Sequence, residues 1–120
     1  MKDEPVDLKI RTKQFALRII KMYSSLPKTT AAQVLGKQIL RSGTSVGANF
    51  REAYRSRSTA EFISILGICL KELEETAYWL ELLNEANILP LKRLELLLDE
   101  CDQLTVIFTS IVKTKKKNIS

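Results

Sequence analysis

The residues of this 120-residue chain with the clearest chemical character are its lysines and arginines, 19 in all, against 14 aspartates and glutamates. Residues 1–57 carry 12 basic and 4 acidic side chains, a balance of +8, whereas residues 58–112 carry 3 and 10, a balance of −7. Four further lysines follow in residues 113–117. Two interpretations are open: the two halves neutralise each other within or between subunits, or the basic half faces a polyanion such as RNA or DNA.

Basic residues that lie off the apolar positions of their segments are candidates for contacts with phosphate groups, an electrostatic interaction that is independent of base sequence. Arg51 and Arg55 stand one helical turn apart and reinforce each other. No helix-turn-helix and no aromatic stacking platform accompanies these residues, so sequence-specific readout is not expected. The candidates are Lys9, Arg11, Lys13, Arg18, Lys21, Arg51, Arg55, Arg57, Lys115 and Lys116.

Enzymatic and metal chemistry have little support in the sequence. The chain has no histidine, which removes the commonest general base and the commonest metal ligand. Glu72, Glu74 and Glu75 would need oxygen ligands from elsewhere, because helical two-metal sites use a Glu-x-x-His pattern. No glycine-rich phosphate loop or nucleophile elbow is present. We therefore expect a protein that is not an enzyme and that holds no cofactor and no metal.

The chain has no segment that predicts membrane insertion or export. No stretch approaches the roughly 18 apolar residues of a membrane helix, and the N-terminus does not lead into an apolar signal region. Cys69 and Cys101 both fall on apolar positions, which predicts buried, reduced thiols. We expect a cytoplasmic protein.

Apolar residues recur at alternating steps of three and four in four segments, the spacing of helices that pack against other helices. We predict helices over residues 7–25, 30–56, 58–87 and 91–115, followed by a short lysine-rich tail. Asp7, Thr30 and Ser58 are the expected N-caps, the last two in capping boxes with Gln33 and Glu61. No strand pattern occurs. Short connections between long helices predict a single all-α domain, an antiparallel up-down-up-down four-helix bundle.

The second helix carries polar groups along its packing face. An antiparallel turn near residue 57 places Arg41 and Ser42 level with Glu72, so we expect Arg41 or Ser42 to contact Glu72 or Glu75. Such contacts form a layer that fixes helix alignment. The predicted layer comprises Arg41, Ser42, Ser45, Asn49, Glu52, Glu72 and Glu75.

Apolar residues cover more of the second and third helices than one bundle needs. Gly43 and Gly47 each cost about 1 kcal/mol relative to alanine in a helix, so a close neighbouring backbone or a large side chain must offset that cost. The excess apolar width predicts association between copies of the chain. The expected interface residues are Phe50, Tyr54, Ile65, Ile68, Trp79 and Leu82.

Three segments carry a resemblance to a known family: Gln38 to Ala53, Ala60 to Phe62, and Lys71 to Leu80. They are similar to the bacterial four-helix-bundle family, also called the ribosomal-RNA intervening-sequence protein family, over about residues 7–113. The resemblance implies an antiparallel four-helix bundle and a homopentameric ring. The chain also resembles the accessory variability protein of diversity-generating retroelements, a basic pentamer that binds nucleic acid and a reverse transcriptase. Phe50-Arg51 and Cys69 are mild departures from the family pattern.

Two functions remain open after the resemblance is considered. The first is an oligomeric helical protein that binds RNA, DNA or a nucleic-acid enzyme through basic surfaces of its first two helices. The second is a protein-interaction scaffold whose charges serve subunit assembly only. Loss of salt-sensitive binding on charge reversal would favour the first, and disruption of the oligomer by the same reversals would favour the second.

Overall fold

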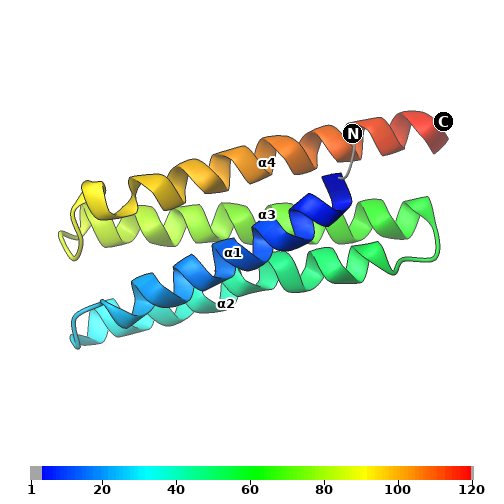
Figure 1. The fold of residues 1–120 in the computed structure, drawn as a ribbon. Helices are drawn as coiled ribbons and strands as arrows, with labels where there is room; N and C mark the ends of the chain where they lie inside the picture. The colour runs from blue at the N-terminus through cyan, green and yellow to red at the C-terminus, as the bar shows by residue number, and fades with distance from the viewer. Residues whose placement is uncertain (1–3, 120) are drawn as a thin grey trace.

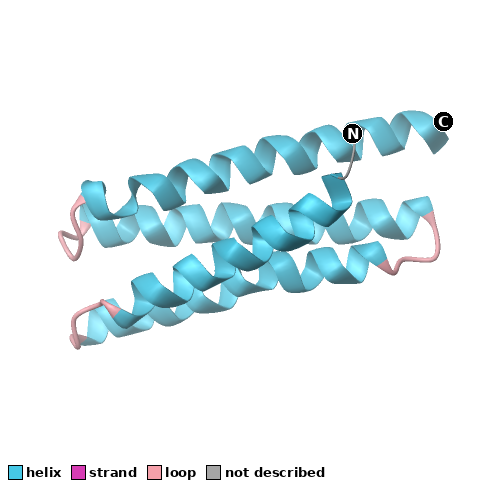
Figure 2. Cartoon of the chain, in the orientation of Figure 1, coloured by secondary structure: helices cyan, strands magenta, loops and turns pink. Residues whose placement is uncertain are grey.

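The computed structural model describes residues 4–119, with side chains described over residues 8–118. It contains four helices, α1 (Glu4–Ser24), α2 (Thr30–Tyr54), α3 (Thr59–Glu85) and α4 (Leu91–Ile119), and no strand within the described residues. Neighbouring helices run in opposite directions and short loops join them at the two ends of the rod (Figures 1 and 2). The bundle measures 49 × 22 × 21 Å along its principal axes. The predicted all-α antiparallel four-helix bundle is confirmed.

Helix α1 begins at Glu4, three residues before the start that the sequence predicted. Pro5 lies in its first turn, where the missing N–H of proline needs no partner. Asp7 is therefore inside the helix and is not its N-cap, and the side chain of Asp7 lies outside the described residues.

The N-cap of α2 is Thr29. The sequence analysis had predicted Thr30, one residue later. Thr29 Oγ1 accepts a hydrogen bond from the backbone N–H of Ala32 at 3.3 Å. Gln33 takes no part in a capping box: its amide group donates to the Pro27 carbonyl at 2.9 Å and accepts from the Tyr23 hydroxyl at 3.0 Å. Gln33 therefore ties α2 back to the end of α1.

Helix α3 has the predicted cap and a defined end. Ser58 Oγ accepts from the backbone N–H of Glu61 at 3.0 Å, and the Glu61 carboxylate accepts from the backbone N–H of Arg57 at 2.9 Å. At the other end, Asn87 has a left-handed φ of 61°, and the N–H groups of Asn87 and Ile88 bond the carbonyls of Asn84 and Leu83, both at 2.9 Å. This is the Schellman pattern, which stops a helix and satisfies its last carbonyls.

Helix α4 is longer than predicted, because it includes the lysine-rich segment and continues to Ile119. Lysine is a good helix former, and its charge is favourable near the negative end of a helix. The segment that the sequence suggested as a tail is therefore the last part of α4.

The core follows the predicted apolar positions of all four helices and includes an aromatic contact between α2 and α4. The rings of Phe50 and Phe108 stack with centroids 5.5 Å apart, and both residues are buried. The prediction that Phe50 belongs to a subunit interface is therefore wrong, because its side chain fills the core of its own protomer. Leu91 departs in the opposite sense: it lies on the predicted apolar positions of α4 but is 51% exposed.

Both cysteines are buried and unpaired, as the sequence predicted. Burial raises the pKa of the Cys69 thiol to about 12, because the apolar surroundings disfavour the thiolate. Burial likewise raises the pKa of the Cys101 thiol to about 12. Both side chains therefore behave as small apolar groups at neutral pH.

The helices pack unevenly around the core. Helix α2 packs extensively on α1 and α3, whereas α1 and α4 touch the least of the neighbouring pairs. Glycines set the close approach of α2 to α1: a Cβ on Gly43 would lie 2.9 Å from Ile19 Cγ1, and one on Gly47 would lie 3.0 Å from Thr12 Oγ1. The expectation that these glycines admit a neighbouring helix is confirmed.

Candidate nucleic-acid interface

A groove with three basic side chains runs between α1 and α2. The residues that form its walls have the same spacing on both helices. On each helix they occupy one face over two successive turns. The volume of the groove is about 280 Å³. Its cationic groups are Lys9, Lys13 and Arg51. The remaining lining residues are Thr12, Ala16, Thr44, Gly47 and Ala48.

Small side chains form the floor of this groove. Gly47 contributes no side chain, and Ala16 and Ala48 contribute only methyl groups. Thr12 Oγ1 donates to the Leu8 carbonyl at 2.7 Å, and Thr44 Oγ1 donates to the Leu40 carbonyl at 2.6 Å. Because each hydroxyl has already given its proton, the floor offers no free hydroxyl donor. The donors available to a ligand are the three basic side chains.

Within the described residues, no ion pair neutralises the charges of the groove. Among the described residues, no carboxylate forms an ion pair with Lys9, Lys13 or Arg51. Lys9 Nζ lies 4.6 Å from the centroid of the Tyr54 ring, a cation–π contact that leaves its charge in place. Three like charges around one groove repel each other, so an anion in the groove would be stabilised.

Arg11, another basic residue of the first half, is paired with an acidic residue of the second half. Arg11 Nε donates to Glu100 Oε2 at 2.7 Å, and its Nη2 donates to Glu100 Oε1 at 2.9 Å and to Gln103 Oε1 at 2.7 Å. Arg11 thereby joins α1 to α4 instead of facing outward with Lys13. The structure places this predicted phosphate contact in an internal ion pair.

The remaining predicted basic residues do not line the α1–α2 groove. Arg18 and Lys21 are exposed on α1, and Arg55 is exposed at the end of α2. Arg57 and Lys115 line a separate polar hollow at the end of the bundle, and Lys116 is exposed on α4. Of the ten candidates, the structure brings Lys9, Lys13 and Arg51 together in one groove.

The cross-helix polar contact that the sequence predicted is present. Arg41 Nη1 donates to Glu72 Oε1 at 3.3 Å, and Arg41 Nη2 donates to Glu75 Oε1 at 2.6 Å. The nearby carboxylates raise the pKa of Arg41, chiefly through the hydrogen bond that Arg41 donates to Glu75. These groups are partly exposed, so the contact belongs to the surface between α2 and α3 and not to the core.

The buried part of this layer is a pair of hydroxyls. Ser42 Oγ and Thr76 Oγ1 lie 2.7 Å apart, and both residues are buried. Thr76 donates its only hydroxyl proton to the Glu72 carbonyl at 2.7 Å, so Ser42 is the donor of the pair. Thr76 was not among the predicted layer residues, although its polar type on an apolar face is a signal that sequence reasoning can use.

The other members of the predicted layer stay on their own helix. Ser45 Oγ donates to the Arg41 carbonyl at 2.7 Å, and Asn49 Nδ2 donates to the Ser45 carbonyl at 2.8 Å. Glu52 is exposed. None of the three makes a hydrogen bond to α3 among the described residues. The layer between α2 and α3 is therefore narrower than predicted.

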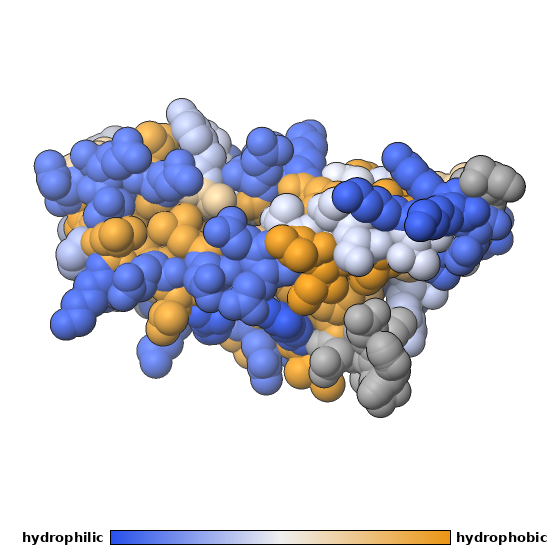
Figure 3. Space-filling model, turned by 90° about the horizontal axis from the view of Figure 1, so that it is seen from above, coloured by the Kyte–Doolittle hydropathy of each residue, from blue (hydrophilic) through white to orange (hydrophobic). Residues whose placement is uncertain are grey.

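Apolar side chains reach solvent on several helices. Of the predicted interface residues, Ile68 and Tyr54 are exposed, and Ile65, Trp79 and Leu82 are half-buried. Trp79 Nε1 is buried and has no hydrogen-bond partner among the described residues. Apolar areas lie between charged ones on the face seen from above (Figure 3). Exposed apolar residues that the sequence analysis did not name are Ile10, Leu17, Ile20, Val34, Tyr78, Leu91, Leu96 and Val106.

The fold defines the class of protein to which this chain belongs, a four-helix bundle whose first two helices are basic and whose third is acidic. The profile of the 23S rRNA-intervening sequence protein family matches residues 6–110, and the chain belongs to this family. A crystal structure of a protein of unknown function from the S23 ribosomal protein family of Bacteroides thetaiotaomicron is similar, with a TM-score of 0.82 and 42% sequence identity. The match covers 88% of this chain and 97% of that chain. None of the curated proteins matches the chain.

The helices of the described residues were also compared with the requirements of a membrane span. None of them combines the length and the apolar character needed to cross a bilayer.

Proposed function

We propose that this protein binds RNA or DNA, without acting as an enzyme, by holding the phosphate backbone in the groove between α1 and α2. The observation that supports this function is the convergence of Lys9, Lys13 and Arg51 around a floor of small residues, with no carboxylate paired to them among the described residues. Phosphate oxygens would accept hydrogen bonds from all three side chains. The groove contains no group arranged to read base edges, so binding is independent of sequence.

The test is a titration of fluorescent single-stranded RNA and duplex DNA with the full chain at several salt concentrations. Each phosphate neutralised contributes roughly 0.7 to the negative slope of log affinity against log salt for single strands and roughly 0.9 for duplex DNA. The double variant Lys13→Glu and Arg51→Glu is expected to weaken binding at least tenfold at low salt. Its salt slope is expected to be smaller by about one unit for each cation removed.

A matched variant controls for net charge. Lys28→Glu with Lys92→Glu makes the same charge change on exposed residues near the opposite end of the bundle. This variant is expected to bind nucleic acid within about threefold of the unmodified chain, because a screened charge acts over only about 10 Å at 0.1 M salt. Equal weakening by both variants, or binding that does not depend on salt, would contradict the proposed groove.

A scaffold function is the second candidate, and the ion pairs of the bundle favour it. Arg11 pairs with Glu100, and Arg41 pairs with Glu72 and Glu75, so part of the charge asymmetry serves packing of the basic half on the acidic half. If all of the charge asymmetry serves assembly, the double variant Lys13→Glu and Arg51→Glu changes the oligomeric mass. In that case it binds no less nucleic acid than the unmodified chain.

We also propose that the protein works as a homo-oligomer, as the family resemblance implies, with a pentamer as the expected form. The exposed apolar residues on α1, α3 and α4 support association, because water-exposed apolar surface of this kind is covered in stable assemblies. Several copies in one assembly would also present several basic grooves to one nucleic acid, which raises the total affinity.

A further inference from the structure

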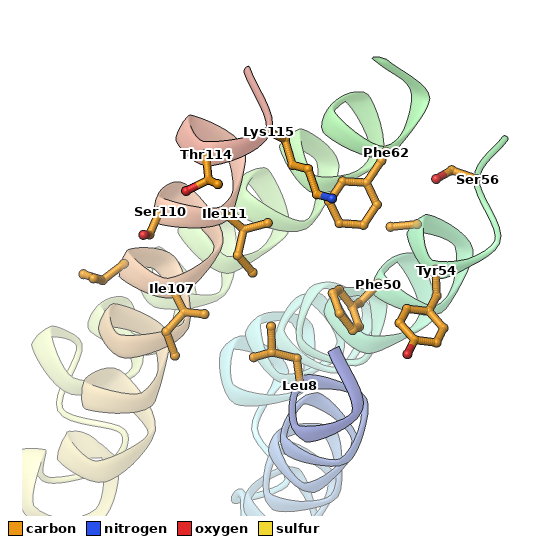
Figure 4. Close-up of a pocket in the computed structure, with 12 residues that line it drawn as sticks. Leu8, Phe50, Tyr54, Ser56, Phe62, Ile107, Ser110, Ile111, Thr114 and Lys115 are labelled. Atoms are coloured by element: carbon orange, nitrogen blue, oxygen red, sulfur yellow. The ribbon is translucent and has the colours of Figure 1, made fainter. Parts of the chain in front are cut away.

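An apolar cavity opens at the end of the bundle that holds the start of α1 and the end of α4. Its volume is about 640 Å³, within the range of small-molecule sites, which is about 300–1,000 Å³. Ile107 and Ile111 of α4 face Leu8 of α1 and Phe50 of α2 across it (Figure 4). Tyr54 completes the apolar wall on the α2 side.

The cavity follows from the lengths of the helices. Arg11 of α1 contacts Glu100 and Gln103 of α4, so the first described residue of α1, Glu4, lies level with about residues 107–110 of α4. The last turns of α4 therefore extend past α1. Ile111 lies on this extension, one turn beyond Ile107. Within the described residues, α1 therefore covers only part of the apolar wall.

The mouth of the cavity carries positive charge. Lys115 Nζ extends over the Phe62 ring, 5.3 Å from its centroid, at the edge of the cavity (Figure 4). Lys115, Phe62 and Ser56 also line the adjoining polar hollow of about 300 Å³, which Arg57 lines as well. The Glu61 carboxylate accepts from the backbone N–H of Arg57, but among the described residues no carboxylate forms a side-chain ion pair with Lys115 or Arg57. An apolar cavity with Lys115 at its edge is thus joined to a hollow lined by a second basic residue.

We propose that this cavity binds an amphipathic anion with a single alkyl chain, its chain among the apolar residues and its carboxylate or phosphate head between Lys115 and Arg57. The apolar wall removes the alkyl chain from water, and the cationic mouth selects the sign of the head group. The positive charge of Lys115 beside an apolar wall favours a ligand that joins an anionic group directly to an alkyl chain. The site is separate from the groove between α1 and α2.

The experiment is calorimetric titration of the full chain with dodecanoate and dodecyl phosphate, each below its critical micelle concentration. Dodecyltrimethylammonium, which has the same alkyl chain and a positive head, is the control ligand. Both anions are expected to bind at least tenfold more tightly than the cation. The relative affinity of dodecanoate and dodecyl phosphate identifies which head group the mouth prefers.

Two substitutions and one matched control locate the site. Lys115→Glu is expected to weaken dodecanoate binding at least tenfold, whereas Lys113→Glu, an exposed residue outside the cavity, changes it less than twofold. Ser110→Trp, which places an indole into the cavity from an exposed position, is expected to abolish binding. Circular dichroism verifies that each variant is folded.

Three outcomes would overturn the proposal. The first is the absence of anion binding below the micelle concentration, which is the result if another part of the chain or a second copy fills the cavity. The second is equal binding of the anions and the cation, which would show that the charge at the mouth does not select the ligand. The third is unchanged dodecanoate binding in a folded Ser110→Trp variant together with a changed oligomeric mass, which would make this end a contact between copies.

Discussion

At the scale of single residues, the glycines of α2 and α3 have opposite surroundings. A Cβ on Gly43 would lie 2.9 Å from Cγ1 of the fully buried Ile19, whereas a Cβ on Gly67 would meet nothing within 4 Å. Both glycines lie inside helices, where alanine is favoured by about 1 kcal/mol. The packing around each glycine therefore decides whether its replacement by alanine lowers or raises the free energy of unfolding.

We predict that Gly43→Ala lowers the free energy of unfolding by roughly 1–2 kcal/mol, because overpacking exceeds the gain in helix propensity. Gly67→Ala is expected to raise it by up to about 1 kcal/mol, because only the propensity changes. Urea denaturation followed by circular dichroism measures both. Stabilisation by Gly43→Ala would show that α1 moves away from α2 at little cost.

The buried thiols predict a dependence of stability on alkaline pH. Burial raises the pKa of the Cys69 and Cys101 thiols from 9.0 to about 12. Between these values the unfolded chain loses protons that the folded chain keeps, so the thiols favour unfolding as pH rises through 9 toward 12. Below pH 9 their contribution to stability is complete.

We expect the double variant Cys69→Ala and Cys101→Ala to be less stable than the unmodified chain at pH 8, because it loses buried volume. The gap in free energy of unfolding is expected to narrow as the pH is raised to 11, since the variant lacks both ionisable groups. Parallel denaturation curves at these pH values measure the gap. A gap that stays constant would contradict burial of the thiols.

At the scale of elements, the start of α2 shows how neighbouring residues compete for one structural role. Thr29 and Thr30 both have the side chain of a good N-cap, and Thr30 has the better sequence spacing because Gln33 follows it by three residues. In the fold, Gln33 contacts Tyr23 and the Pro27 carbonyl instead. The tertiary contact of Gln33 with the end of α1 removes the capping box, and Thr29 takes the cap.

This pair gives a direct test. Thr29→Ala is expected to lower the free energy of unfolding by about 1 kcal/mol, because the N–H of Ala32 loses its acceptor. Thr30→Ala, an exposed change in the first turn of α2, is expected to stay within about 0.5 kcal/mol. Thermal unfolding of the two variants under the same conditions distinguishes them. A larger loss of stability for Thr30→Ala than for Thr29→Ala would show that Thr30 is the N-cap, as the sequence predicted.

At the scale of the whole molecule, charge is distributed unevenly over the four helices. Basic α1 and α2 pack against acidic α3 and against residues 91–112 of α4, whereas the end of α4 carries four lysines. Ion pairs between Arg11 and Glu100 and between Arg41 and Glu75 join the basic and acidic segments. Such exposed or half-exposed pairs each contribute about 1 kcal/mol or less. The charges on the outer face of the basic half, by contrast, act on whatever approaches the molecule.

We predict that light scattering after size exclusion gives a mass of several protomers of 13.7 kDa, five if the family resemblance holds. Ile68→Asp is expected to lower that mass, because it places a charge on an exposed apolar residue of α3 in the predicted interface. Leu91→Asp, an equivalent change outside the predicted set, serves as its control. A single-protomer mass for the unmodified chain would remove the proposed oligomer.

Much of the architecture was predictable from the sequence. The apolar spacing placed Leu66, Leu73 and Leu80 on one buried face of α3. The capping-box spacing of Ser58 and Glu61 predicted where α3 begins. Less of the candidate interface was predictable. Phe50 belongs to a second apolar stripe beside the main packing face of α2, and periodicity alone does not tell whether that stripe faces the core or a neighbouring copy.

The sequence by itself determined the number of helices, their order and their buried faces, because helix periodicity and capping depend on residues within a few positions of each other. The tertiary structure alone decided what each charged side chain does. Arg11 and Lys13 are two residues apart on α1, yet Arg11 is held by Glu100 of α4 while Lys13 lines the groove with Arg51 of α2. The physical reason is that ion pairs and grooves form between helices, so they depend on how distant segments pack.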